Sequence, residues 1–141
     1  MKTEVKEKID ALVQNISALG TQDGQAASDR LLSELTAMTA TPEERKEAGE
    51  YLRREMRLRR KCEHVDVAGL FGETGDAVSY AYIAQKYFGK GQSWFSQRLN
   101  RSIVNGKPSA FTGKELTVLA DALQDLSRRL SDVSVKIQQG I

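Results

Sequence analysis

The last long stretch of the chain, residues 111–137, has the sequence FTGKELTVLADALQDLSRRLSDVSVKI. Thr112 and Glu115 form the pattern of a capping box, which predicts the start of a helix. Phe111 and Leu116 occupy the two positions of a hydrophobic staple around the same start. Apolar residues then recur at alternating spacings of three and four, which predicts one long amphipathic helix on Leu116, Leu119, Leu123, Leu126, Leu130, Val133 and Ile137.

The first part of the chain contains three further helix patterns. An amphipathic helix with a heptad-like seam is expected first, on Val5, Ile9, Leu12, Ile16 and Leu19. A second helix is expected over residues 25–40, and the run Thr41-Pro42-Glu43-Glu44 predicts the start of a third, which continues to about Lys61. Because the chain has only two prolines and few alternating β-branched runs, the sequence predicts an all-α protein.

Residues 79–114 form a basic segment without a single acidic residue, although the whole chain has 21 basic and 19 acidic residues. Its basic residues are Lys86, Lys90, Arg98, Arg101, Lys107 and Lys114. The segment predicts two short helices, over residues 82–88 and 94–100, with a turn over residues 89–92 (GKGQ) between them. A basic helix-turn-helix of this kind suits a polyanion, and duplex DNA is the simplest one.

The second of these short helices is expected to hold the residues that contact DNA. Phe95 and Leu99 are expected to face the core, so that Trp94 and the polar side chains around it face outward. Contacts to base edges are expected from Gln92, Gln97 and Arg98. Phosphate contacts are expected from Lys90, Arg101 and Lys107. Ser93 is the expected N-cap, at a helix start that also suits phosphate. An alternative orientation buries Trp94 and removes Arg98 from the exposed face.

Three runs of this region resemble the Cro/repressor-type helix-turn-helix domain. They are residues 83–89 (IAQKYFG), 93–99 (SWFSQRL) and 111–123 (FTGKELTVLADAL). The similarity lies within residues 76–126 and departs from that pattern by one extra residue in the turn. It implies a DNA-binding protein such as a small transcriptional regulator or a mobile-element accessory protein. The C-terminal half also resembles an uncharacterised family of small bacterial proteins built around the same segment, which implies no known activity.

Three segments are expected along the chain. They are an N-terminal helical region for self-association (residues 1–62), a linker with three glycines (63–75) and the helix-turn-helix domain with its extended last helix (76–141). A compact DNA-binding domain needs only the first half of that last helix. The seams from Leu126 to Ile137 and from Val5 to Leu19 are therefore candidates for a homodimer interface, and packing within one chain is the alternative.

Two other kinds of binding protein remain open. A protein–protein adaptor would use Trp94 and the basic face to hold an acidic partner without binding DNA. An RNA-binding protein would use Tyr80, Tyr82 and Trp94 as stacking platforms for bases.

Several function classes are not expected. Cys62 and His64 are the only residues of their types and do not supply the four ligands of a structural zinc site. No catalytic constellation is present, so neither an enzyme nor a cofactor is expected. Basic residues from Arg53 to Lys61 are interpreted as a solvated helix end, and the alternative is a second phosphate-contacting surface or a site for an acidic partner. No apolar run approaches the ~18 residues of a membrane span, and the charged N-terminus lacks the pattern of a secretion signal. A cytoplasmic protein is expected.

Overall fold

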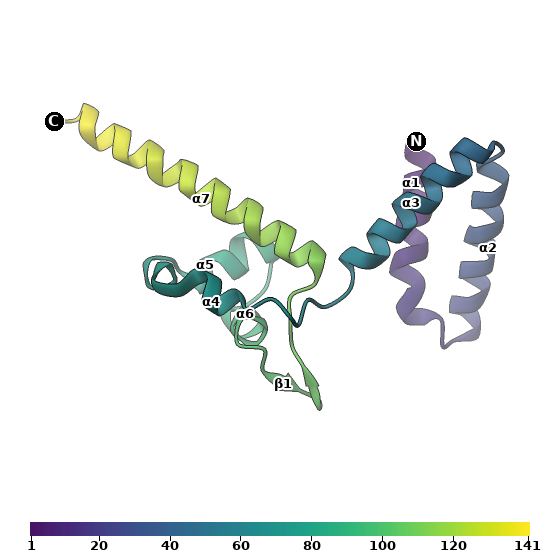
Figure 1. Cartoon of the computed structure of the whole chain (residues 1–141), viewed down its shortest axis with the longest axis horizontal. Helices are drawn as coiled ribbons and strands as arrows, with labels where there is room; N and C mark the ends of the chain where they lie inside the picture. The colour runs from purple at the N-terminus through teal and green to yellow at the C-terminus, as the bar shows by residue number, and fades with distance from the viewer. The chain divides into compact units, whose positions relative to one another are not determined.

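The computed structural model describes all 141 residues, which form two units, Met1–Arg59 (unit 1) and Arg60–Ile141 (unit 2). Both units are built from α-helices, which confirms the predicted all-α class (Figure 1). The single sheet is a two-stranded hairpin in unit 2. None of the helices combines the length and the apolar content that a membrane crossing requires.

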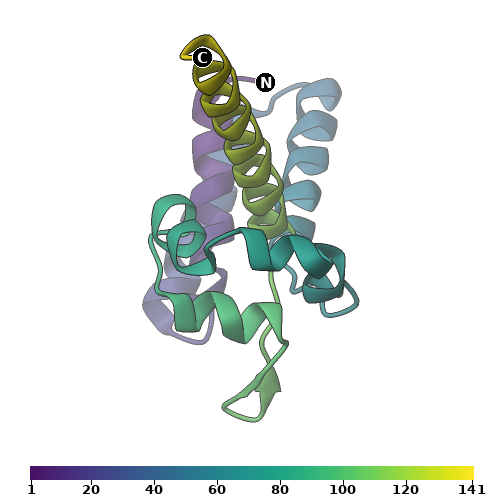
Figure 2. The same cartoon turned by 90° about the vertical axis from the view of Figure 1, so that its left-hand side faces the viewer.

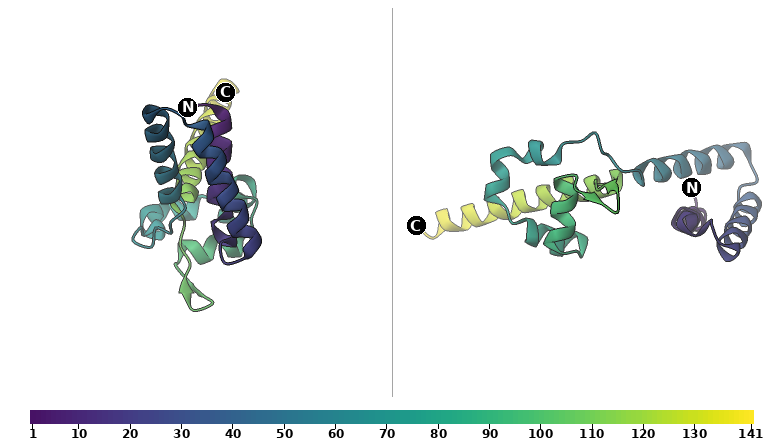
Figure 3. Two further views of the ribbon diagram at one scale, coloured as in Figure 1. Left: turned by 90° about the vertical axis from the view of Figure 1, so that its right-hand side faces the viewer. Right: turned by 90° about the horizontal axis from the view of Figure 1, so that it is seen from below.

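Unit 1 consists of three helices, α1 (Thr3–Gln14), α2 (Gln22–Met38) and α3 (Pro42–Leu58), and α1 packs against both others (Figure 3). The expected first helix is shorter than its apolar seam, because a 3-10 turn, η1 (Asn15–Ala18), follows Gln14. Its core contains Val5, Ile9, Leu12 and Leu35. Three of the five seam residues, Val5, Ile9 and Leu12, are thus buried within unit 1, whereas Leu19 is 37% exposed.

Local hydrogen bonds explain where these helices begin. Thr21 accepts a hydrogen bond from the Gly24 N–H at 3.0 Å. Thr41 caps α3 as predicted, by accepting from the Glu44 N–H at 3.2 Å. Between α1 and α3, the Tyr51 hydroxyl donates to the Asp10 carboxylate at 2.8 Å, and this bond raises the pKa of Tyr51 to about 12.

Unit 2 begins with a short helix that the sequence did not predict, α4 (Val67–Phe71), followed by the 3-10 helix η2 (Gly72–Ala77). Val67 and Phe71 are buried in the core of unit 2 with residues from four other helical elements, α5, η3, α6 and α7. The expected linker over residues 63–75 is therefore part of this unit, and the boundary lies at Arg59–Arg60 instead of residue 62. The glycines in this stretch separate short helical elements that pack on a core.

The chain enters unit 2 beside the start of its last helix. The Cys62 N–H donates to the Phe111 carbonyl at 2.8 Å, and the Gly113 N–H donates to the Arg60 carbonyl at 3.1 Å. Lys61 and Thr112 form an isolated antiparallel bridge between these two bonds. We call this pairing of residues 60–62 with 111–113 the neck.

The two short helices of the basic segment form with shifted bounds. The first is α5 (Tyr80–Ile83), capped by Ser79 and continued by a π-helical turn, η3 (Ala84–Phe88). Gly89 ends it with a φ of 65°, which glycine adopts without steric cost. The second is α6 (Gln92–Leu99), whose N-cap is Gly91 and not Ser93. The connection thus has three residues, because Gln92, counted in the turn from the sequence, belongs to α6.

After α6 the chain forms a hairpin, β1 (Ile103–Val104) and β2 (Lys107–Pro108), that the sequence analysis did not anticipate. Asn105 and Gly106 have φ angles of 52° and 77° and form its two-residue turn. Two consecutive positive φ angles are the mark of a type I′ turn, for which Asn-Gly is a favoured sequence.

The last helix, α7 (Gly113–Gln139), has 27 residues and begins at the predicted capping box. The Glu115 N–H donates to the Thr112 hydroxyl at 3.1 Å, and the Thr112 N–H donates to the Glu115 carboxylate at 2.9 Å. Its first half packs on the core of unit 2, whereas its residues from Ser127 onward are exposed and extend beyond that core (Figure 2).

Candidate nucleic-acid interface

The exposed face of α6 is polar. Phe95 and Leu99 are buried, as the sequence predicted, and the exposed positions are Gln92, Ser93 and Gln97, followed by Asn100 at the C-cap. No side chain caps the N-terminus of α6, where Gly91 is the N-cap. Gln92, Ser93 and Gln97 therefore lie outward as expected, although Ser93 lies in the first helical turn and not at the cap.

Trp94 and Arg98 are not on this exposed face. The Trp94 ring is half-buried and lies 5.1 Å from Phe88 and 6.1 Å from Phe111, measured between ring centroids. The Arg98 guanidinium lies over the Trp94 ring, 4.2 Å from its centroid. Their predicted exposure was wrong, and the alternative orientation, with Trp94 against the core, is the one observed.

Arg98 also connects α6 to the start of α7. Its Nε atom lies 3.7 Å from the carboxylate of Glu115, the residue that completes the capping box of α7. Both side chains are about three-quarters buried, so this ion pair is shielded from solvent. Trp94, Arg98 and Glu115 together form a structural link between the two helices, which sequence periodicity alone did not distinguish from an exposed basic position.

Arg101 forms part of the C-terminal cap of α6, and its positive charge is partly neutralised. Its φ of 53° places it in the left-handed region, and the Ser102 N–H donates to the Gln97 carbonyl at 2.8 Å, as in a Schellman cap. The guanidinium lies 3.9 Å from Asp66 and donates to the Glu63 carbonyl at 3.3 Å. About half of its side chain remains exposed.

Lysines without an ion-pair partner flank α6. Lys90 is exposed in the turn before the helix, and Lys107 is exposed on the hairpin after it. Lys86 and Lys114 are also exposed, and no carboxylate lies within ion-pair distance of any of these four lysines. Figure 2 shows α6 and the hairpin together at the end of unit 2 that lies away from the free end of α7.

Two features of this surface were not predicted from the sequence. One is the hairpin, which the Asn105-Gly106 dipeptide could have indicated. The other is Lys61, which the neck brings to the base of the hairpin, where its ammonium donates to the Pro108 carbonyl at 3.4 Å. The Lys61 contact is not visible in sequence spacing, because 47 residues separate Lys61 from Pro108.

Two of the three aromatic residues considered for RNA stacking are occupied inside unit 2. The Tyr80 ring stacks on Phe95 at 5.3 Å and meets Phe71 edge-on at 5.4 Å. Trp94 packs on the core as described above. Tyr82 is exposed but accepts a hydrogen bond from Arg129 at 2.9 Å. The three free aromatic rings that an RNA-binding protein would use for stacking are therefore not available together.

The comparisons with known proteins identify the family of this region and nothing more. A family model described as Domain of unknown function (DUF5053) matches residues 67–137, half of the chain. No curated protein and no solved structure matches. The matched residues run from the first residue of α4 to near the end of α7, so they include α5, α6, the hairpin and the core that holds them. The chain belongs to the family described as Domain of unknown function (DUF5053).

Proposed function

We propose that unit 2 binds duplex DNA with α6 directed into the major groove. The observation that carries this proposal is the polar outer face of α6 between two unpaired lysines, Lys90 and Lys107, in a segment without acidic residues. An α-helix with its side chains is about 10 to 12 Å in diameter, which suits a major groove about 12 Å wide. A small transcriptional regulator or mobile-element accessory protein is the kind of protein that we infer.

The residues of α6 divide into three roles in this proposal. Base contacts come from Gln92 and Gln97, and the exposed Asn100 adds a third amide, since Asn and Gln side chains pair with adenine edges. Ser93 and the uncapped N–H groups of the first turn bind a phosphate. Arg98 has no direct contact with DNA. It holds α6 against α7.

Phosphate contacts come from the two sides of α6. Lys90 and Lys107 set the register of the protein on the duplex, and the half-exposed Arg101 adds positive charge beside them. Lys61 lies at the base of the hairpin and extends the basic surface on that side. Contacts of this kind do not depend on sequence, so they fix orientation while the amides of α6 supply preference.

The test is the salt dependence of binding to a labelled random duplex, followed by fluorescence anisotropy between about 50 and 200 mM salt. Replacing two phosphate-binding lysines in the Lys90→Ala/Lys107→Ala variant should reduce the slope of log affinity against log salt by about 2. The matched control is Lys2→Ala/Lys46→Ala, which removes two exposed, unpaired lysines of unit 1 and should leave the slope unchanged. Absence of binding at low salt, or equal effects of both variants, would contradict the proposal.

One observation favours the alternative of a protein–protein adaptor. Because Arg98 is held by Trp94 and Glu115, α6 has lost one of its three expected base-reading side chains. An adaptor would use the same basic surface for an acidic protein, and its binding would also weaken with salt. A competition experiment separates the two functions. Unlabelled random duplex DNA displaces labelled duplex from a DNA-binding protein, whereas an adaptor binds neither the labelled nor the unlabelled duplex.

A further inference from the structure

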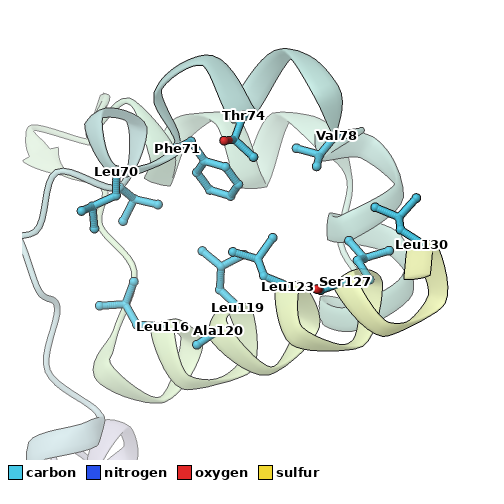
Figure 4. Close-up of a pocket in the computed structure, with 12 residues that line it drawn as sticks. Leu70, Phe71, Thr74, Val78, Leu116, Leu119, Ala120, Leu123, Ser127 and Leu130 are labelled. Carbon is cyan, nitrogen blue, oxygen red and sulfur yellow. The ribbon is translucent and has the colours of Figure 1, made fainter. Parts of the chain in front are cut away.

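An open apolar groove of about 500 Å³ runs along α7 in unit 2 (Figure 4). One wall is formed by α4 and η2 and the residue after them, with Leu70, Phe71 and Val78. The other wall is formed by α7, with Leu116, Leu123 and Leu130. Leu70 is 79% exposed, although leucines next to a core are usually covered. A continuous apolar hollow of this kind marks an interaction site.

The same molecule presents an apolar stripe that nothing covers. Beyond Leu126, the exposed residues 127–139 of α7 form what we call the tail. Leu130, Val133 and Ile137 lie on one face of it and are 66%, 52% and 61% exposed. They continue the heptad-like seam that the first half of α7 buries in its own unit. A helix of this length gains most of its stability from packing such a stripe against a partner.

Most of the N-terminal seam is already used within unit 1. Its residues Val5, Ile9 and Leu12 are at most 9% exposed, because they form the core of unit 1. Covering the tail with them would require unit 1 to open.

Length argues that the tail of one chain fits the groove of another. The stripe from Leu126 to Ile137 is about 16 Å long at 1.5 Å per residue, and the α7 side of the groove, from Leu116 to Leu130, is about 21 Å long. A tail lying antiparallel to the α7 of its partner can therefore place its whole stripe inside the groove. The same contact formed reciprocally closes a twofold dimer, in which both grooves and both tails are used.

The charges of the tail and of the α4 wall also favour binding of the tail in the groove. The segment that forms the α4 wall, residues 62–78, contains the acidic residues Glu63, Asp66, Glu73 and Asp76 and no Lys or Arg. None of the four lines the groove itself, and Asp66 is paired with Arg101. Residues 127–137 of the tail contain three basic residues, Arg128, Arg129 and Lys136, against the single acid Asp132. Arg128 and Arg129 share Asp125 at 3.8 Å each, and Lys136 has no ion-pair partner. The tail is thus the more basic and the wall the more acidic surface.

A coiled coil of two tails would gain less from these charges. On either side of the stripe, the flanking positions hold Arg129 and Lys136 on one side and Ser127 and Ser134 on the other. Basic residues would face serines in a parallel pair and each other in an antiparallel pair, so neither arrangement forms an ion pair across the interface.

We propose that the protein is a dimer in which the α7 tail of each chain binds the groove between α4 and α7 of the other. This contact uses a surface separate from α6 and the hairpin, and it does not depend on DNA binding.

The test is the molar mass of the full chain by sedimentation equilibrium. Wild type is expected to be a dimer, and Leu70→Asp in the groove and Val133→Asp in the tail should each weaken dimerisation at least tenfold. Ile103→Asp is the matched control, because Ile103 is 67% exposed on the hairpin and should leave the dimer intact. All three positions are exposed, so the far-ultraviolet circular dichroism of the variants should match that of wild type.

Each other outcome overturns the proposal. A monomeric wild-type protein excludes the dimer. A Leu70→Asp chain that remains dimeric while Val133→Asp is monomeric indicates tails paired with each other. If both variants remain dimeric, the interface lies elsewhere. The DNA proposal is tested separately, because a monomer that binds random duplex with the expected salt slope would overturn only the dimer.

Discussion

Arg98 shows how one residue of a basic segment can have a structural role. Its guanidinium lies over the ring of Trp94 and beside the carboxylate of Glu115, and both contacts are largely shielded from water. A cation over a shielded tryptophan contributes about 1 to 2 kcal/mol, more than an exposed ion pair does. The positive charge of the segment is therefore not a direct measure of the charge available to DNA.

Replacing Arg98 should therefore affect stability more than binding. Arg98→Ala is expected to lower the free energy of unfolding of unit 2 by about 1 kcal/mol, because the cation–π contact and the ion pair are both lost. Urea unfolding followed by the fluorescence of Trp94, the only tryptophan of the chain, measures this directly in unit 2.

Gln97→Ala is the matched comparison, on the exposed face of the same helix. It should change stability by less than about 0.5 kcal/mol and reduce affinity for a preferred duplex by roughly tenfold. The reverse pattern, with a stable Arg98→Ala chain that binds DNA weakly, would assign base reading to Arg98.

At the scale of elements, helix starts were the most predictable features. Thr41 and Thr112 cap α3 and α7 as the sequence indicated, because a capping box depends on residues only three positions apart. The orientation of α6 was not predictable in the same way. An eight-residue helix has too few turns for apolar spacing to decide whether Trp94 faces the core, and here the aromatic residues Phe88 and Phe111 decide it.

Other elements were missed because they are short. The five-residue helix α4 lies among glycines that resemble a linker, and its place in the core depends on contacts with residues far along the chain. The hairpin has strands of two residues each, too short for an alternating pattern, so its turn was the only local indication.

The corner between η1 and α2 gives a test of local packing. A Cβ added to Gly24 would overlap the backbone carbonyl of Ala18, whereas one added to Gly20 would meet nothing within 4 Å. Gly24→Ala is therefore expected to destabilise unit 1 by about 1 to 3 kcal/mol, and Gly20→Ala should have little effect. Urea unfolding followed by circular dichroism at 222 nm measures both, and similar midpoints for the two variants would show that the corner relaxes freely.

At the scale of the whole molecule, the DNA-binding and dimer proposals together predict the symmetry of the DNA site. A twofold dimer with one α6 per chain should prefer a near-palindrome, with half-sites about one helical turn, roughly 34 Å, apart. Selection from a pool of random duplexes tests this expectation. Wild type should recover paired half-sites with one fixed spacing.

The same selection with Val133→Asp is the control, because a monomer should recover single half-sites. If the variant recovers the same paired sites as wild type, then the dimer on DNA does not depend on the tail. If wild type recovers no shared motif, α6 contributes no sequence preference, and the binding is architectural.

The neck also has an evolutionary consequence. The backbone hydrogen bonds between residues 60–62 and 111–113 close the segment from 60 to 113 into a ring. Arg60 is the first residue that takes part in them. Unit 1 is joined just before that ring is sealed, and the family match begins only at residue 67. We infer that a gene fusion between Arg59 and Arg60 would exchange one N-terminal helical module for another without breaking the hydrogen bonds of the neck. The joint just before the neck is therefore a natural point for recombination.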